Sequence, residues 1–228
     1  MLIIKLVLCL VETIFLAFFI RLVKSLIKKA PLDALLWIKE LEEHSLKFVG
    51  ISGSIVGSKT KIAVEYSLNL IQKRYSEVET VHLHLGDLNI EFCDGRDYRD
   101  YVGDTKYLIH QMMSADALII GTPTFQASIP GTLKNVFDLL PEEALIDKVV
   151  GIIATAGSPK HYLMVEQQLK PILSYMKATI VQKYVFIEDK DYIKKEITNN
   201  DVLSRLNRLV EDVYDTYNSV QFMKKEFA

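Results

Sequence analysis

The chain has 228 residues, of which 50% are apolar and 25% are charged, and its formal net charge is −2. This size and composition suit one ordinary domain with an appendage. A near-neutral charge, with no long basic run after the N-terminal region, argues against a nucleic-acid partner. Cys9 and Cys93 lie far apart and outside any C-x-x-C motif, so they predict neither a disulfide framework nor a zinc site. This cysteine usage favours a reducing compartment, the cytoplasm.

The first segment of the chain is unusual for a soluble enzyme. Residues 2–20 are almost wholly apolar, and a basic cluster follows over residues 21–29. The apolar run is just long enough to span a bilayer, which takes roughly 20 residues, although Glu12 near its middle would be costly there. Because the basic cluster comes after the apolar run, a cleaved secretory signal is disfavoured, and an inserted helix would leave the rest of the chain in the cytoplasm. Three interpretations of residues 2–20 therefore stay open. The segment contacts a membrane, it forms a helix that lies on a surface or packs against a partner, or it is a stretch wrongly included upstream of the natural start of the protein.

A second helix is predicted over residues 31–44, with Pro31 in its first turn and leucines along one side. The two segments form a hydrophobic N-terminal helical extension, residues 1–45. The main domain is expected over residues 46–228.

A strand, a loop of small residues and a helix follow one another early in this domain. Residues 48–52 indicate a short buried strand that breaks at Gly53, and a helix is expected to begin near Ser58. Ser54, Ser58 and Thr60 offer hydroxyl groups, and the helix start offers free N–H groups and a positive dipole end. The stretch therefore predicts a phosphate-binding site, called the phosphate cup below, formed by the loop and the helix start. The alternative interpretation is an ordinary strand-to-helix turn in which serine caps the helix.

Two common phosphate-binding motifs do not match this loop. Gly53 and Gly57 enclose three residues, and Ser58 separates Gly57 from Lys59, whereas the nucleoside-triphosphate loop needs four enclosed residues and then Gly-Lys-Ser/Thr. The dinucleotide pattern G-x-G-x-x-G is absent as well. What remains is a cup for a single terminal phosphate, which suits a mononucleotide such as FMN.

From here the pattern alternates strand and helix. Further strands are predicted at residues 80–85, 117–121, 149–155 and 179–187, and helices at residues 58–75, 105–114, 131–140, 161–176 and 201–222. Five strands with helices between them predict an α/β fold with a parallel sheet covered on both faces. His82 and His84 alternate with apolar residues and have no third ligand nearby, so they are interpreted as outward-facing strand residues and no metal site is predicted.

Ligands of such sheets bind at the carboxyl ends of the strands, which brings together the loops 53–60, 122–130 and 156–161. In the second loop Pro123 gives stiffness, Phe125 a flat apolar surface and Gln126 hydrogen bonds. The third loop presents backbone N–H groups at a turn of small residues. One phosphate cup and two loops suited to a flat ring with polar edges predict an FMN site. No catalytic side chain is predicted, because the cofactor does the chemistry.

These motifs resemble the NADPH-dependent FMN reductases of the flavodoxin-like superfold. The resemblance covers roughly residues 47–190 and rests on Gly53-Ser54 with Ser58 and Thr60, and on residues 115–123, 131–138 and 154–158. Residues 139–150 and 157–162 look especially like the reductases that supply flavin to alkanesulfonate monooxygenases.

The resemblance implies a doubly wound five-stranded parallel sheet of order 2-1-3-4-5 and hydride transfer from NADPH or NADH to FMN. It also implies a homodimer or homotetramer and a flavin-dependent monooxygenase as partner. By position, the residues at the FMN phosphate would be Ser54, Ser58 and Thr60, those lining the ring Pro123, Thr124, Phe125 and Gln126, and those at its pyrimidine edge Gly157 and Ser158.

The sequence departs from the family pattern at two places. Val56 stands where family members usually have arginine, so Lys59 is expected to supply the positive charge. Ile129 stands near a position that can be aromatic in reductases that release flavin. The second departure leaves open a reductase that holds FMN tightly and reduces quinones, azo compounds or metals. Two further hypotheses are a non-catalytic electron carrier like flavodoxin and a membrane-tethered scaffold that has lost flavin.

Overall fold

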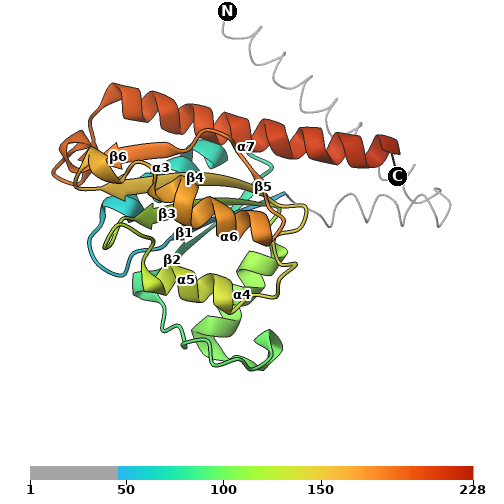
Figure 1. Cartoon of the computed structure of the whole chain (residues 1–228). Coiled ribbons are helices and arrows are strands. Elements are labelled where there is room, and N and C mark those ends of the chain that lie inside the picture. The colour runs from blue at the N-terminus through green and yellow to red at the C-terminus, as the bar shows by residue number, and fades with distance from the viewer. Residues whose placement is uncertain (1–45, 228) are drawn as a thin grey trace, which may run out of the picture. The chain divides into compact units, whose positions relative to one another are not determined.

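The computed structural model describes residues 46–227, and a parallel sheet lies at the centre of this part of the chain (Figure 1). Its strands run in the order β2-β1-β3-β4-β5, and β6 also pairs with β4. The predicted order 2-1-3-4-5 is thus confirmed. The strands are β1 (Lys47–Ser52), β2 (Glu79–His84), β3 (Ala117–Pro123), β4 (Val149–Ala156), β5 (Thr179–Ile180) and β6 (Val185–Glu188).

The fifth strand position is divided between two short segments, although the sequence predicts one continuous strand over residues 179–187. Both segments pair with β4 in parallel, β5 at its start and β6 at its end. Val181 N still donates to Val150 O of β4 (2.9 Å), and at the next residue the carbonyl of Gln182 accepts from Lys170 Nζ (3.2 Å). Side-chain contacts of this kind leave no mark in an alternating hydrophobic pattern.

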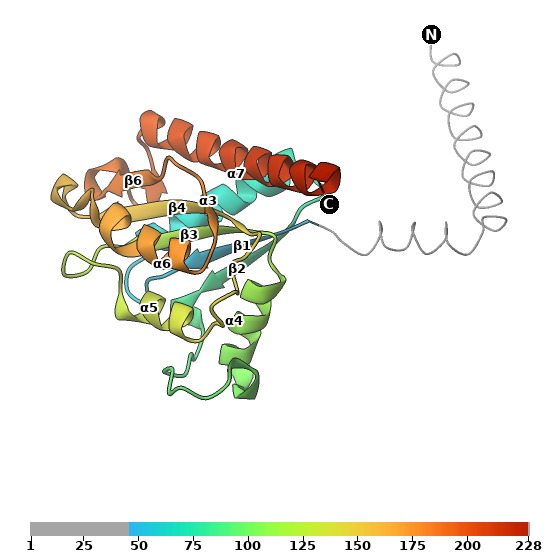
Figure 2. The same cartoon turned by 45° about the vertical axis from the view of Figure 1, so that its right-hand side comes forward.

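Helices cover both faces of the sheet, as Figures 1 and 2 show. Helices α3 (Lys59–Arg74) and α7 (Asn200–Phe227) pack on one face. Helices α4 (Gly103–Ser114), α5 (Gly131–Asp138) and α6 (Lys170–Tyr175) pack on the other. A small antiparallel hairpin, β7 (Tyr192–Ile193) and β8 (Glu196–Ile197), precedes α7.

Among the helices predicted between residues 46 and 227, the one over residues 161–176 differs in form. It consists of a 3₁₀ turn (Pro159–His161), a π-helical segment (Val165–Leu169) and then α6. Proline at 171 has no N–H to donate to the preceding turn, so a regular α-helical ladder cannot run through this point.

The core explains why the central strands are continuously apolar. Every residue of β3 is buried. Leu118 and Ile120 pack toward α4, α5 and α6, whereas Ala117 and Ile119 pack toward α3 and α7. A strand buried on both faces has no reason to alternate apolar and polar residues.

Glycine at 121 lets α3 approach the sheet closely. A Cβ atom built on Gly121 would clash with Val64 Cγ2 and would lie 2.9 Å from Thr60 Cγ2, both on α3. The missing side chain therefore sets how deeply the start of α3 sits against the edge of the sheet.

None of the helices between residues 46 and 227 is both long enough and apolar enough to cross a membrane. The predicted N-terminal helical extension, with its membrane contact at residues 2–20, lies outside the described residues.

Substituting Gly121 by alanine should lower the free energy of unfolding by about 1–3 kcal/mol, because α3 must shift to admit the methyl group. Urea denaturation measures this change. Gly131→Ala is the matched control, since no atom lies within 4 Å of its added Cβ. Equal stabilities of the two variants would contradict the close approach of α3.

Candidate functional site

A cavity of about 390 Å³ opens where the strands β3, β4 and β6 end and α3 begins. It brings together residues from all three predicted loops: Ser58, Lys59, Thr60, Pro123, Thr124, Phe125 and Gly157. The other lining residues, which were not among the predicted cofactor-binding residues, are Val56, Gly57, Thr155, Ala156 and Asp189. The predicted residues Ser54, Gln126 and Ser158 are not among the lining residues.

The start of α3 forms one end of the cavity. Gly57 has a left-handed φ of 79°, which turns the loop into the helix. The helical ladder begins with Ile62 N donating to Ser58 O (2.9 Å), so the N–H groups of residues 59–61 have no partner in the helix. The Ser58 side chain makes no capping bond, and the first turn contains no acidic residue. This end of the cavity suits an anion.

Two of the predicted phosphate hydroxyls have partners within the protein. The Ser54 side chain is buried, accepts from Val56 N (3.2 Å) and donates to Val56 O, so it closes the loop on itself. The Thr60 and Thr155 hydroxyls lie 2.7 Å apart and join α3 to β4. In this structure both hydroxyls shape the cup.

Lys59 carries the positive charge at this end and has a carboxylate beside it. Its Nζ lies 2.8 Å from Asp189 Oδ1, and its backbone carbonyl accepts a hydrogen bond from the Tyr192 hydroxyl (3.0 Å). Burial raises the pKa of Tyr192, so the phenol stays protonated and keeps donating. Asp189 directly follows β6, and the carboxyl-end rule applied to this last strand would have found it.

The loop after β3 forms a tight hairpin at the other end. Phe125 and Ser128 exchange two backbone hydrogen bonds of 2.9 Å each. Gln126 and Ala127 at its tip have positive φ values of 48° and 61°, as in a two-residue hairpin turn. Phe125 is 42% exposed beside the cavity, so its ring offers a flat apolar surface. Left-handed non-glycine residues often mark functional sites because the surrounding structure must hold them there.

Thr124 carries an unsatisfied hydroxyl on the cavity wall. Its N–H donates to Thr155 O (2.9 Å), but its Oγ1 is buried and has no hydrogen-bond partner among the described residues. An unsatisfied buried group of this kind costs about 1–3 kcal/mol. Because Thr124 is a lining residue, we interpret its hydroxyl as a candidate ligand contact.

The third predicted loop meets the cavity at Gly157. The Ser158 hydroxyl accepts from Lys160 N (3.3 Å) and caps the turn that follows, while the Ser158 backbone is extended (φ −152°). An anion cup at one end and an exposed aromatic ring with an unsatisfied hydroxyl at the other fit FMN.

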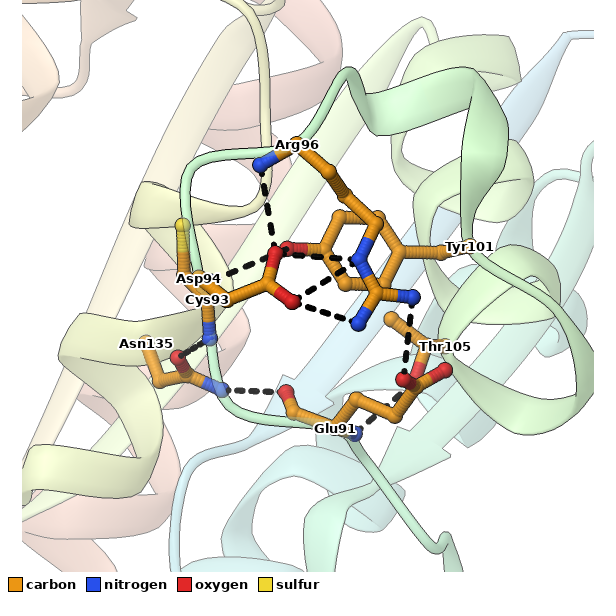
Figure 3. Close-up of polar contacts among 7 residues, drawn as sticks. All are labelled: Glu91, Cys93, Asp94, Arg96, Tyr101, Thr105 and Asn135. Carbon is orange, nitrogen blue, oxygen red and sulfur yellow. Dashed lines mark hydrogen bonds and ion pairs between the residues drawn. The ribbon is translucent and has the colours of Figure 1, made fainter.

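A second polar cluster lies outside this cavity, in the segment between β2 and α4 (Figure 3). Asn135 of α5 accepts from Cys93 N (2.8 Å) and donates to Glu91 O (2.9 Å). Arg96 binds both carboxylate oxygens of Asp94 (3.0 and 2.9 Å) and thereby lowers the pKa of Asp94. These groups satisfy one another, so the cluster fixes the segment against α5. The described residues contain no group of three or more potential metal ligands.

The fold is flavodoxin-like, and the cavity lies where such a fold is expected to bind a mononucleotide. The model of the NADPH-dependent FMN reductase family matches residues 46–192. The chain belongs to this family and is an oxidoreductase that works with FMN and NAD(P)H.

Three relatives give the extent of the similarity. An NAD(P)H-dependent FAD/FMN reductase of Geobacillus thermodenitrificans is 41% identical over 169 residues, 74% of this chain and 91% of that protein. An FMN reductase (NADPH) of Pseudomonas putida is 35% identical over 172 residues, 74% of this chain and 85% of that protein. The crystal structure of the NADH:FMN oxidoreductase EMOB in its apo form is 30% identical, with a TM-score of 0.62 over 73% of this chain and 87% of that chain.

Replacing Thr124 by valine should leave the melting temperature without flavin unchanged or higher, because an unsatisfied hydroxyl is removed. FMN affinity should fall about fivefold, the effect of one neutral hydrogen bond of about 1 kcal/mol. Thermal melts with and without FMN measure both quantities. Thr122→Val is the matched control, since that buried hydroxyl already donates to Pro123 O (2.9 Å): it should lose stability and keep its FMN affinity. A Thr124→Val protein that melts lower and binds FMN as the wild type does would contradict the assignment.

Proposed function

We propose that this chain transfers a hydride from NADPH or NADH to FMN bound in the cavity at the carboxyl ends of β3, β4 and β6. The cavity carries this proposal, because it joins a helix start without acidic residues to an exposed aromatic ring and an unsatisfied hydroxyl. The phosphate binds at the N–H groups of α3 with Ser58, Lys59 and Thr60, and Ser54 shapes the loop that leads there. The ring lies between residues 123–126 and residues 157–158.

FMN, when bound, supplies the hydride-accepting chemistry. The protein binds and orients it. The dipole of α3 and the ammonium group of Lys59 balance the phosphate charge. Phe125 and Thr124 would hold the ring, and the backbone N–H groups of Gly157 and Ser158 would donate to its pyrimidine edge. Preorganised backbone donors stabilise negative charge that develops there without having to rearrange.

Anaerobic mixing of the purified full chain with FMN and NADPH tests the reaction. Catalytic amounts of protein should bleach the visible absorbance of many equivalents of FMN. Bleaching of bound flavin alone, followed by reoxidation with a quinone or azo compound, would favour a reductase that holds FMN tightly. Failure of NADPH and NADH to reduce the flavin would leave only an electron carrier.

Ser58→Ala should raise the KM for FMN by roughly 10- to 100-fold, since a hydrogen bond to a charged group contributes about 1.5–3 kcal/mol. Stability should barely change, because the Ser58 side chain caps no helical N–H. Steady-state kinetics with varied FMN measure the effect. Ser219→Ala on α7, which removes a hydroxyl bonded to Asp215 O (2.8 Å), is the control. An unchanged KM would place the phosphate elsewhere.

Ser158→Ala should keep most of the activity, whereas Ser158→Pro should lose FMN binding, hydride transfer or both. Proline deletes the N–H and cannot adopt the φ of −152° found here. Activity assays on folded variants, checked by circular dichroism, compare the two. Equal activities would mean that this loop does not hold the ring.

We also propose that residues 46–228 form the reductase domain and that it assembles as a homodimer or homotetramer. Support for an interface comes from a groove between α5 and α6, lined in part by Phe137, Leu140 and Ile172, next to Tyr175, which is 67% exposed. A flavin-dependent monooxygenase that takes up the reduced flavin is the proposed partner. The proposed location is the cytoplasm, with membrane association through residues 2–20.

Deleting residues 1–45 should leave a folded oligomer that binds FMN, because every cavity-lining residue lies beyond residue 55. Light scattering and flavin titration check this, and fractionation of the full chain checks membrane association. An active monomer would contradict the proposed assembly, and an unfolded product would contradict the domain boundary.

A further inference from the structure

Asp189 places a carboxylate in the wall of the cavity proposed to bind FMN. Its Oδ1 lies 2.8 Å from Lys59 Nζ. Its Oδ2 lies 3.7 Å from the position that a Cβ on Gly157 would take. The carboxylate therefore stands between the phosphate end of the cavity and the loop at the ring edge.

The chain segment around Asp189 is held firmly. Asp189 begins a 3₁₀ turn in which Glu188 N donates to Asp191 Oδ2 (2.9 Å). Asp191 is buried, and its Oδ1 accepts from Asn199 Nδ2 (2.7 Å). The hydroxyl of Tyr192, three residues after Asp189, binds the backbone carbonyl of Lys59 (3.0 Å). The same segment thus anchors the backbone at both partners of the Lys59–Asp189 pair, whose side chains are 40% and 57% exposed.

The charges in this cavity balance. Among the described residues that line it, Lys59 is the basic side chain and Asp189 is the acidic one. A phosphate bound at the start of α3 competes with Asp189 for the ammonium group of Lys59. The negative charge of Asp189 also repels the phosphate. A site optimised for tight phosphate binding would not contain this carboxylate.

We propose that Asp189 sets the affinity for the flavin phosphate. It holds Lys59 when the cavity is empty and yields it to the phosphate, so that FMN binds weakly enough to exchange with the solution. This role rests on the proposed function, since it assumes that FMN binds in this cavity. It makes Asp189 a residue that tunes release of a flavin product rather than one that touches the reacting atoms.

Fluorescence titration of the full chain with FMN and with riboflavin tests the role. Asp189→Asn keeps the shape of the side chain and should lower the Kd for FMN about three- to tenfold at low salt, because a like charge is removed. The gain should shrink in 1 M salt, where the charges are screened. The Kd for riboflavin, which lacks the phosphate, should change by less than about twofold, since no charge pair is involved.

Asp87→Asn is the matched control. Asp87 pairs with Lys61 at the start of the same helix (2.9 Å) but does not line the cavity. The two carboxylates are similarly exposed, 65% for Asp87 and 57% for Asp189, so the comparison isolates the position of the charge relative to the cavity. Asp87→Asn changes the net charge equally and should shift the Kd for FMN by less than about twofold.

Three outcomes would overturn the role of Asp189: an unchanged or weaker FMN affinity in a folded Asp189→Asn protein, an equal gain for FMN and riboflavin, or an equal gain in Asp87→Asn. Asp189→Ser is the second variant if the asparagine variant misfolds, and the same gain is expected from it. A wild-type chain that binds no FMN would overturn the proposed function itself, and the role of Asp189 with it.

Discussion

The register of three parallel strands determines where the site lies. Ser52 at the end of β1 pairs with Gly121, and Pro123 at the end of β3 pairs with Thr155. The hydrogen bonds continue past the strands, from Gly53 N to Gly121 O (2.8 Å) and from Thr124 N to Thr155 O (2.9 Å). The loops are therefore bonded extensions of the sheet. A shift of one strand by a single residue would move its loop away from the others and would also turn core side chains to the wrong face.

The helix start depends on the same sheet. The close approach permitted by Gly121 brings Thr60 against the strand ends, and the Thr60–Thr155 hydrogen bond fastens it there. The free N–H groups of α3 and the loop around Phe125 consequently open into one cavity. Rigidity of this kind suits a protein that leaves the chemistry to a cofactor, because positioning is then its main contribution.

The sequence predicts the parts of this structure that follow from local patterns. Continuous apolar runs, glycine turns and the carboxyl-end rule were sufficient for the parallel α/β fold and for the three loops, whereas the strand order followed from the family resemblance. The hydrogen bonds between the Ser54 hydroxyl and the backbone of Val56 were not predictable, because the sequence does not indicate which backbone group a loop serine will bind. The pairing of Lys59 with Asp189 joins residues 130 positions apart, and a contact across such a distance leaves no local pattern.

The position of the phosphate in a crystal of the full chain grown with FMN tests the account most directly. The phosphate should lie within hydrogen-bond distance of the N–H groups of residues 58–60, with the ring against Phe125. A different cavity of about 510 Å³, lined in part by Tyr162, Arg205 and Arg208, lies on another part of the surface and also offers aromatic and cationic groups. FMN bound there, with the start of α3 unoccupied, would contradict the account.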